Sequence, residues 1–274
     1  MDKSLKPKIK TILFAAVLIV LMLVIQFVAA FFGSAAVSFV TVFMGESLDV
    51  QSLVPISMLV SEMVCIIVFG IWYFNKYVKK DKNEGVYESG LKKILNFKDL
   101  VFIITLTVAG FFLANIISQF ISAAIPEAGK KLESLMNSLL VDGNIFGVIS
   151  TVLLGPIAEE LVFRGLLVKN AKKEFGLIGC MVLSGIAFGI MHLNPIQGIY
   201  AIPLGMIFAY FAYRYNSIIP TILAHIINNS IAVFLPKIYH GDMGYITCTV
   251  LCLAFLAVSV TVKKCFFKKE LVIS

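Results

Sequence analysis

The chain has 274 residues, of which 59% are hydrophobic and only 14% are charged, whereas about 25% are charged in an ordinary soluble domain. These proportions exclude a soluble globular protein, a disordered chain and a coiled coil. The formal net charge is +7 at pH 7, which in a membrane protein reflects basic loops on one side of the bilayer and gives no support to nucleic-acid binding.

Eight apolar runs predict an all-α, polytopic membrane protein with about eight transmembrane helices. The runs cover about 11–32, 53–75, 100–125, 145–168, 177–193, 198–213, 217–235 and 244–262. A spanning helix needs about 20 residues, so the fifth and sixth runs are short. Residues 126–144 predict a short amphipathic helix on the outer surface. The chain therefore divides into N-terminal helices with a basic loop (1–144), a core (145–240), and a last helix with a basic tail (241–274).

Lysine and arginine predict the orientation of these helices. If all eight runs span the membrane, 19 of these basic residues fall on one side, and three (Lys130, Lys131 and Lys237) fall on the other. Basic residues concentrate in cytoplasmic loops. We therefore expect both termini in the cytoplasm.

Six ionisable residues lie inside the predicted spans, where charge is costly and usually serves function. They are Glu62, Glu159, Glu160, Arg164, His192 and His225. We expect Glu62 either to line a water-filled cavity or to bond to a neighbouring helix. The third histidine, His240, falls in an outer loop, where we expect it to be solvated.

The fourth run contains two adjacent glutamates and an arginine. Glu160 and Arg164 are four residues apart, so they share a helix face and can pair. The chain has two arginines against 21 lysines, and placing one here favours a planar guanidinium that makes two parallel bonds to Glu160. Glu159 lies about 100° around the helix from Glu160. It has no obvious partner on its own helix, which suits a general base. Alternatively, these charges only join helices.

Two further pairs have the same four-residue spacing. Phe188 and His192 share one face of the fifth run, and His225 and Asn229 share one face of the seventh. His225 and Asn229 suit an oxyanion clamp or part of a metal site. Alternatively, a histidine inside a membrane often only makes a hydrogen bond between helices, and His225 and Asn229 can equally serve only helix packing. Asn228 points away and is expected to pack.

The order and spacing of these motifs resemble those of the CPBP family, the CAAX protease and bacteriocin-processing family, also called Abi. The motifs are Glu159-Glu160-x-x-x-Arg164, Phe188-x-x-x-His192 and His225-x-x-x-Asn229. The resemblance covers about 156–235 and places the catalytic core in the fourth, fifth and seventh helices. It implies an intramembrane endopeptidase in which Glu160 and Arg164 form a structural pair, supported by Phe188.

The resemblance also implies roles for four residues. Glu159 would activate water with the assistance of His192, while His225 and Asn229 would stabilise the oxyanion. Alternatively, Glu159, His192 and His225 could supply a zinc site with an open position. We favour no cofactor, with zinc possible as the alternative, because zinc ligation of Glu159 leaves no separate base and Asn229 is a poor zinc ligand.

These features predict a protease in a bacterial plasma membrane whose partners are a peptide or membrane-protein substrate and the lipid bilayer, with no nucleic acid. One alternative is a non-enzymatic immunity or scaffold protein of the same fold. Another is a proton-coupled transporter that uses Glu62, Glu159 and Glu160. The absence of an internal repeat in the sequence argues against a transporter built from inverted halves.

Overall fold

The structure is a computed structural model that describes residues 5–45, 50–87, 89–140, 144–239 and 243–266. All regular structure in these ranges is helical, which confirms the predicted all-α class. His240 lies outside the described residues. The elements in chain order are α1 (Leu5–Phe43), α2 (Val50–Tyr73), η1 (Phe74–Val78), α3 (Lys79–Asn83), α4 (Leu91–Ile94), α5 (Phe97–Ala124), α6 (Pro126–Leu140), α7 (Ile145–Ile149), η3 (Ser150–Leu154), α8 (Gly155–Glu160), η4 (Leu161–Val168), α9 (Lys169–Ala171), α10 (Leu177–Met191), α11 (Pro195–Tyr215), α12 (Ile219–Ile238) and α13 (Tyr245–Phe266).

Each of the eight apolar runs is helical, and within the described ranges seven helical stretches are long and apolar enough to cross a membrane. The fifth run, α10, has 15 residues and is about 22 Å long at 1.5 Å per residue. It ends where Leu193 takes a positive φ of 55°. Asn194 then caps α11 by accepting from the amides of Ile196 and Gln197, with Pro195 in the first helical position. This tight turn keeps the fifth helix short.

The fourth run is one continuous helical stretch, Ile145–Ala171, with two wider π-helical segments, η3 and η4. Pro156 is the second residue of α8, between these two segments, and has no N–H to donate to the preceding turn. Wider turns of this kind are rare and often occur at functional sites. The two adjacent glutamates therefore lie on a short α-helical segment between two widened ones.

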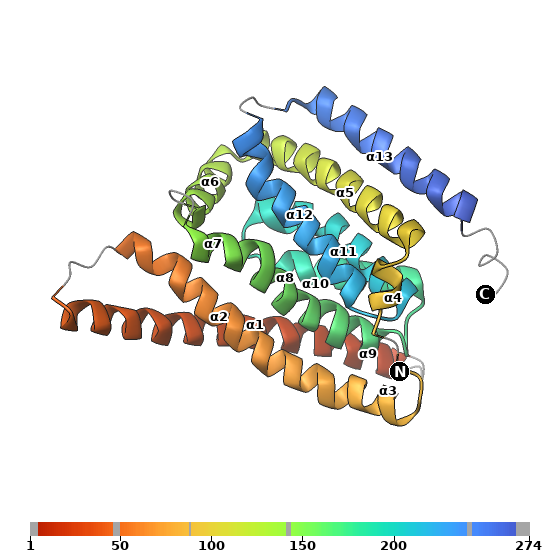
Figure 1. Cartoon of the computed structure of the whole chain (residues 1–274), viewed down its shortest axis with the longest axis horizontal. Coiled ribbons are helices and arrows are strands. Elements are labelled where there is room, and N and C mark those ends of the chain that lie inside the picture. Colours follow the sequence, from red (N-terminus) through yellow and green to blue (C-terminus); the bar gives the residue numbers. More distant parts are fainter. Residues whose placement is uncertain (1–4, 46–49, 88, 141–143, 240–242, 267–274) are drawn as a thin grey trace.

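The helices form a layered bundle (Figure 1). Helices α1 and α2 run side by side along one face, and α5 packs against α13 on the other. Between them lie the fourth stretch, α10, α11 and α12. The predicted amphipathic segment contains α6, which packs against α5, α2 and α11. Helix α1 begins and α13 ends at the same end of the bundle (Figure 1), as expected for an even number of crossings.

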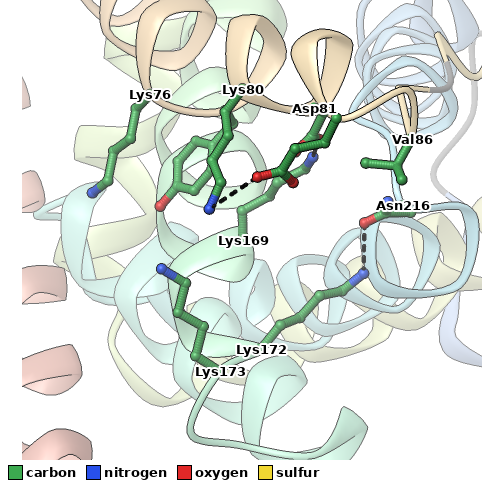
Figure 2. Close-up of a pocket in the computed structure, with 10 residues that line it drawn as sticks. Lys76, Lys80, Asp81, Val86, Lys169, Lys172, Lys173 and Asn216 are labelled. Carbon is green, nitrogen blue, oxygen red and sulfur yellow. Dashed lines mark hydrogen bonds and ion pairs between the residues drawn. The ribbon is translucent and has the colours of Figure 1, made fainter.

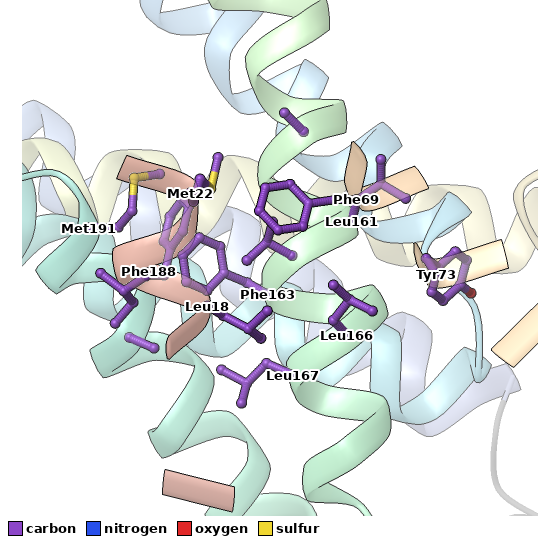
Figure 3. Close-up of a cluster of buried hydrophobic side chains, with 14 of the residues drawn as sticks. Leu18, Met22, Phe69, Tyr73, Leu161, Phe163, Leu166, Leu167, Phe188 and Met191 are labelled. Atoms are coloured by element: carbon purple, nitrogen blue, oxygen red, sulfur yellow. The ribbon is translucent and has the colours of Figure 1, made fainter. Parts of the chain in front are cut away.

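A cluster of buried apolar side chains joins the fourth stretch to its neighbours (Figure 3). Phe163, Leu166 and Leu167 of η4 are fully buried, and they pack with Leu18 of α1 and Phe69 of α2. Burying a large apolar side chain contributes about 1.5–3 kcal/mol. The cluster therefore holds η4 in place from the side of α1 and α2.

Glycines bring α10 and α11 into backbone contact. A Cβ on Gly185 would lie 2.8 Å from the carbonyl oxygen of Ile202, and one on Gly189 would lie 2.5 Å from that of Gly198. A Cβ on Gly205 would lie 2.9 Å from the Cα of Gly185. Small residues four apart allow this close approach between membrane helices.

We predict that Gly189→Ala lowers the free energy of unfolding by about 1–3 kcal/mol, because the added methyl group meets backbone that must move. Thermal unfolding in detergent measures the effect. Gly70→Ala is the matched control, since its Cβ would meet only Leu161 at an ordinary 3.8 Å and alanine favours helix. Equal melting temperatures for native protein and Gly189→Ala would contradict this account of the α10–α11 contact.

Candidate active site

The ionisable residues of the motifs come from three neighbouring parts of the bundle. Glu159 and Glu160 end α8, Arg164 lies in η4, and His225 lies on α12. His192 is the C-cap residue that follows Met191, the last residue of α10. A fourth part, α11, was not predicted to contribute, yet it supplies a backbone acceptor and an aromatic ring.

Glu160 is fully buried and binds two partners through one oxygen. Its Oε1 accepts a hydrogen bond from Arg164 Nη1 at 2.8 Å and lies 2.9 Å from His225 Nδ1. The Glu160–Arg164 pair therefore forms as the four-residue spacing predicted. The contact to His225 joins residues 65 apart in the chain, and no local spacing could predict it.

The predicted pair of parallel bonds from Arg164 to Glu160 is wrong. The second terminal nitrogen, Nη2, donates instead to the carbonyl oxygen of Gly205 at 3.0 Å. The planar fork is thus shared between a side chain and the α11 backbone. The guanidinium carbon also lies 4.6 Å from the ring centroid of Phe188 and 5.3 Å from that of Phe208, which is within cation–π range.

Glu159 is the more accessible of the two glutamates. Its side chain is 14% exposed, whereas that of Glu160 is 0% exposed. Its Oε2 lies 3.5 Å from His225 Nε2, on the opposite side of the imidazole from Glu160. Among the described residues, no ion pair joins Glu159 to a residue of its own helix, as the helical spacing led us to expect.

Aromatic rings contact both histidines. The Phe188 ring lies 4.9 Å from the ring of His192 and 5.6 Å from that of His225. The Phe208 ring also packs against His225, with 4.8 Å between the two ring centroids. Phe188 thus contacts both imidazoles and the guanidinium of Arg164, which explains its place beside the charged groups.

Asn229 links α12 to the fourth stretch. Its Nδ2 donates to the carbonyl oxygen of Thr151 at 2.8 Å, and its Oδ1 accepts from Asn228 Nδ2 at 3.0 Å. Asn228 is buried, as a packing role requires, but it also orients the neighbouring amide. A side-chain amide has two N–H groups, so Asn229 keeps one N–H beyond its bond to Thr151.

Glu62 bonds to a neighbouring helix, one of the two environments expected for it. Gln26 of α1 donates to its Oε1 at 3.1 Å. Its other oxygen, Oε2, is buried and has no hydrogen-bond partner in the described part of the protein. Glu62 is therefore a polar link between α1 and α2.

A zinc site made of Glu159, His192 and His225 does not fit the side chains as they are placed. Among the described residues, no group of three or more His, Cys, Asp or Glu side chains is positioned to hold a metal ion. His225 Nδ1 is taken by Glu160, and Nε2 faces Glu159. Metal dependence stays a prediction that experiment must test.

Three participants gave no usable signal in the sequence. The acceptors from Gly205 and Thr151 are backbone carbonyls, which every residue carries. Phe208 is one of 23 phenylalanines, and only its contacts with His225 and Arg164 distinguish it. Such contributions depend on helix packing and cannot be found from spacing within one helix.

Comparison with known proteins gives one family and one relative. Residues 142–231 match the family model described as "Type II CAAX prenyl endopeptidase Rce1-like", which confirms the resemblance noted in the sequence. Over 133 residues the chain is 26% identical to a Bacillus subtilis (strain 168) protein described as "Putative membrane peptidase YdiL". That alignment covers 47% of this chain and 54% of the relative, about half of each. No solved structure matches.

We predict that Arg164→Lys destabilises the protein by about 2 kcal/mol, the scale of one charged hydrogen bond. A lysine ammonium lacks the fork that reaches both Glu160 and the Gly205 carbonyl. Thermal unfolding in detergent measures the change. An Arg164→Lys protein that melts at the native temperature would show that the fork at Arg164 has no special role.

Proposed function

We propose that this chain, a member of the CPBP/CAAX protease family, is an intramembrane endopeptidase that hydrolyses peptide bonds with water activated by Glu159. The observation that carries the proposal is the pair of adjacent glutamates with different partners. Glu160 is fully buried and bonded to Arg164 and His225, whereas Glu159 is partly exposed beside His225 Nε2.

The two glutamates differ in the way that a base and its support should differ. A general base must reach the proton that it takes. One oxygen of Glu160 already makes hydrogen-bond contacts with Arg164 and His225, and its other oxygen is buried. Glu159 has a carboxylate oxygen near His225 and some exposure. We therefore assign the base to Glu159 and the support to Glu160.

The contact with Glu160 sets the role of His225. A carboxylate paired with Arg164 accepts hydrogen bonds, so His225 donates to it from Nδ1–H. The Nε2 atom then faces Glu159 and the space where water reacts. When Nε2 is protonated, the imidazolium is stabilised by Glu160 and can donate to a developing oxyanion.

In the proposed reaction, the water oxygen bonds to the carbonyl carbon of the substrate while Glu159 takes a proton from the water. The carbonyl oxygen becomes the oxyanion, which accepts hydrogen bonds from His225 Nε2–H and from the second N–H of Asn229. The C–N bond then breaks, and the proton held by Glu159 passes to the departing amine nitrogen. His192, the remaining histidine of the motifs, assists Glu159 in orienting the water.

We further propose a multi-pass protein of a bacterial plasma membrane with both termini in the cytoplasm. The excess of lysine on one side of the eight predicted spans supports this orientation. Its substrate is a peptide or a membrane-associated protein, since Glu159, His225 and Asn229 lie within helices that are long and apolar enough to cross the bilayer.

We predict that Glu159→Gln lowers kcat by at least about 100-fold, because glutamine keeps the shape but cannot take a proton. Cleavage of a peptide library by purified protein, followed by mass spectrometry, supplies the assay. Glu133→Gln, an exposed glutamate on α6, is the matched control and should behave as native. A Glu159→Gln protein that is folded and cleaves at more than about a tenth of the native rate would contradict the assignment. If native protein cleaves nothing, a scaffold or immunity role gains support.

We predict that a chelator leaves cleavage unchanged, because in this mechanism Glu159 acts directly on water. Metal content by mass spectrometry and activity before and after chelation test this together. Zinc near one per chain, with activity lost on its removal and restored on its return, would contradict the mechanism. Glu159, His192 and His225 would then become the expected ligands.

A further inference from the structure

A polar pocket lies away from the glutamates, at the end of the bundle where α1 begins. It has a volume of about 340 Å³ and lies between the end of the α2–η1–α3 helix and the segment around α9. Its lining is dominated by charge (Figure 2). The charged lining residues are Lys76, Lys80, Lys169, Lys172, Lys173, Asp81 and Glu84.

The carboxylates in this pocket neutralise only part of its positive charge. Asp81 pairs with Lys169 at 2.6 Å, and Glu84 pairs with Lys80 at 3.7 Å. Five lysines and two carboxylates leave an excess of three positive charges. Within the described part of the chain, the other three lysines have no carboxylate partner.

Those three lysines converge on the pocket from two sides. Figure 2 shows Lys76 reaching in from η1 and Lys173 reaching toward it from the segment after α9. Lys172 is held in place by the carbonyl oxygen of Tyr213 at 2.9 Å and by Asn216 Oδ1 at 3.2 Å. Hydrogen bonds to neutral acceptors thus hold the Lys172 ammonium in place, whereas the Lys76 ammonium lies 4.6 Å from the ring centroid of Phe14.

This concentration of cations is unfavourable without an anion. Burial, and to a lesser extent the nearby charge of Lys169, lower the pKa of Lys172 to about 8. A negative group in the pocket would favour the charged lysine and relieve the repulsion. The protein therefore places positive charge where an anionic ligand would stabilise it.

We propose that this pocket binds a phosphate group that carries net negative charge, and its place in the fold favours the headgroup of an anionic phospholipid. The pocket lies where two membrane helices end, on the side that carries most of the lysines. Basic pockets between membrane helices on the cytoplasmic side bind such headgroups. Free phosphate offers the same chemistry. This proposal does not depend on the protease assignment, because none of its residues belongs to the motifs.

The test measures lipid binding to the purified full-length protein by native mass spectrometry. Phosphatidylglycerol is compared with phosphatidylcholine of the same acyl chains, and the titration is repeated with excess inorganic phosphate. The variants are Lys173→Gln, which removes an exposed side chain, and Lys172→Gln. Lys264→Gln on α13 is the control, because it removes one exposed lysine from the same side of the bundle.

We expect phosphatidylglycerol to bind more tightly than phosphatidylcholine. Lys173→Gln and Lys172→Gln should each weaken it about fivefold, the effect of one lysine near an anionic headgroup, while Lys264→Gln leaves it unchanged. Binding that survives inorganic phosphate assigns the site to a lipid, whereas displacement assigns it to free phosphate. Equal binding of the two lipids, or equal losses from Lys173→Gln and Lys264→Gln, would overturn the proposal.

Discussion

The buried carboxylate of Glu160, together with its partner Arg164, links the fourth helical stretch to α12 and α11. One carboxylate oxygen accepts from Arg164 in η4 and contacts His225 on α12, while the same guanidinium bonds to the Gly205 carbonyl on α11. A charge taken out of water costs several kcal/mol unless it is paired and hydrogen-bonded. The arginine must therefore reach Glu160, and α11 must lie close enough to supply its carbonyl. Once these contacts form, the imidazole of His225 is fixed with its other nitrogen toward Glu159.

Helix packing makes this network possible. Glycines on α10 and α11 allow the two backbones to touch, and α11 then lies where Gly205 can accept from Arg164 and Phe208 can cover His225. On the other side, the apolar cluster of α1, α2 and η4 holds the arginine-bearing segment in place. The glutamates lie on the short α-helical segment between η3 and η4. The charged site thus depends on glycine contacts and apolar packing that contain no charged residue.

Patterns within one helix could be predicted from the sequence, and contacts between helices could not. Each of the eight hydrophobic runs coincides with a helix in the described part of the chain, and the four-residue spacing found the Glu160–Arg164 pair. The same spacing argument failed for the second arginine bond, because its acceptor is a backbone carbonyl 41 residues away. It also could not show that His225 lies between Glu159 and Glu160. Lysines that indicated orientation turned out to line a pocket, since the sequence does not reveal which loops meet.

The most direct test of the account is the protonation of His225, because Glu160 should hold this ring through Nδ1–H. The chain has three histidines, so ¹⁵N-histidine labelling gives a simple NMR spectrum that His225→Gln can assign. We predict that His225 carries a proton on Nδ1 and that Glu160→Gln shifts its signals more than those of the other two histidines. A neutral ring protonated only on Nε2, with signals unchanged by Glu160→Gln, would contradict the account.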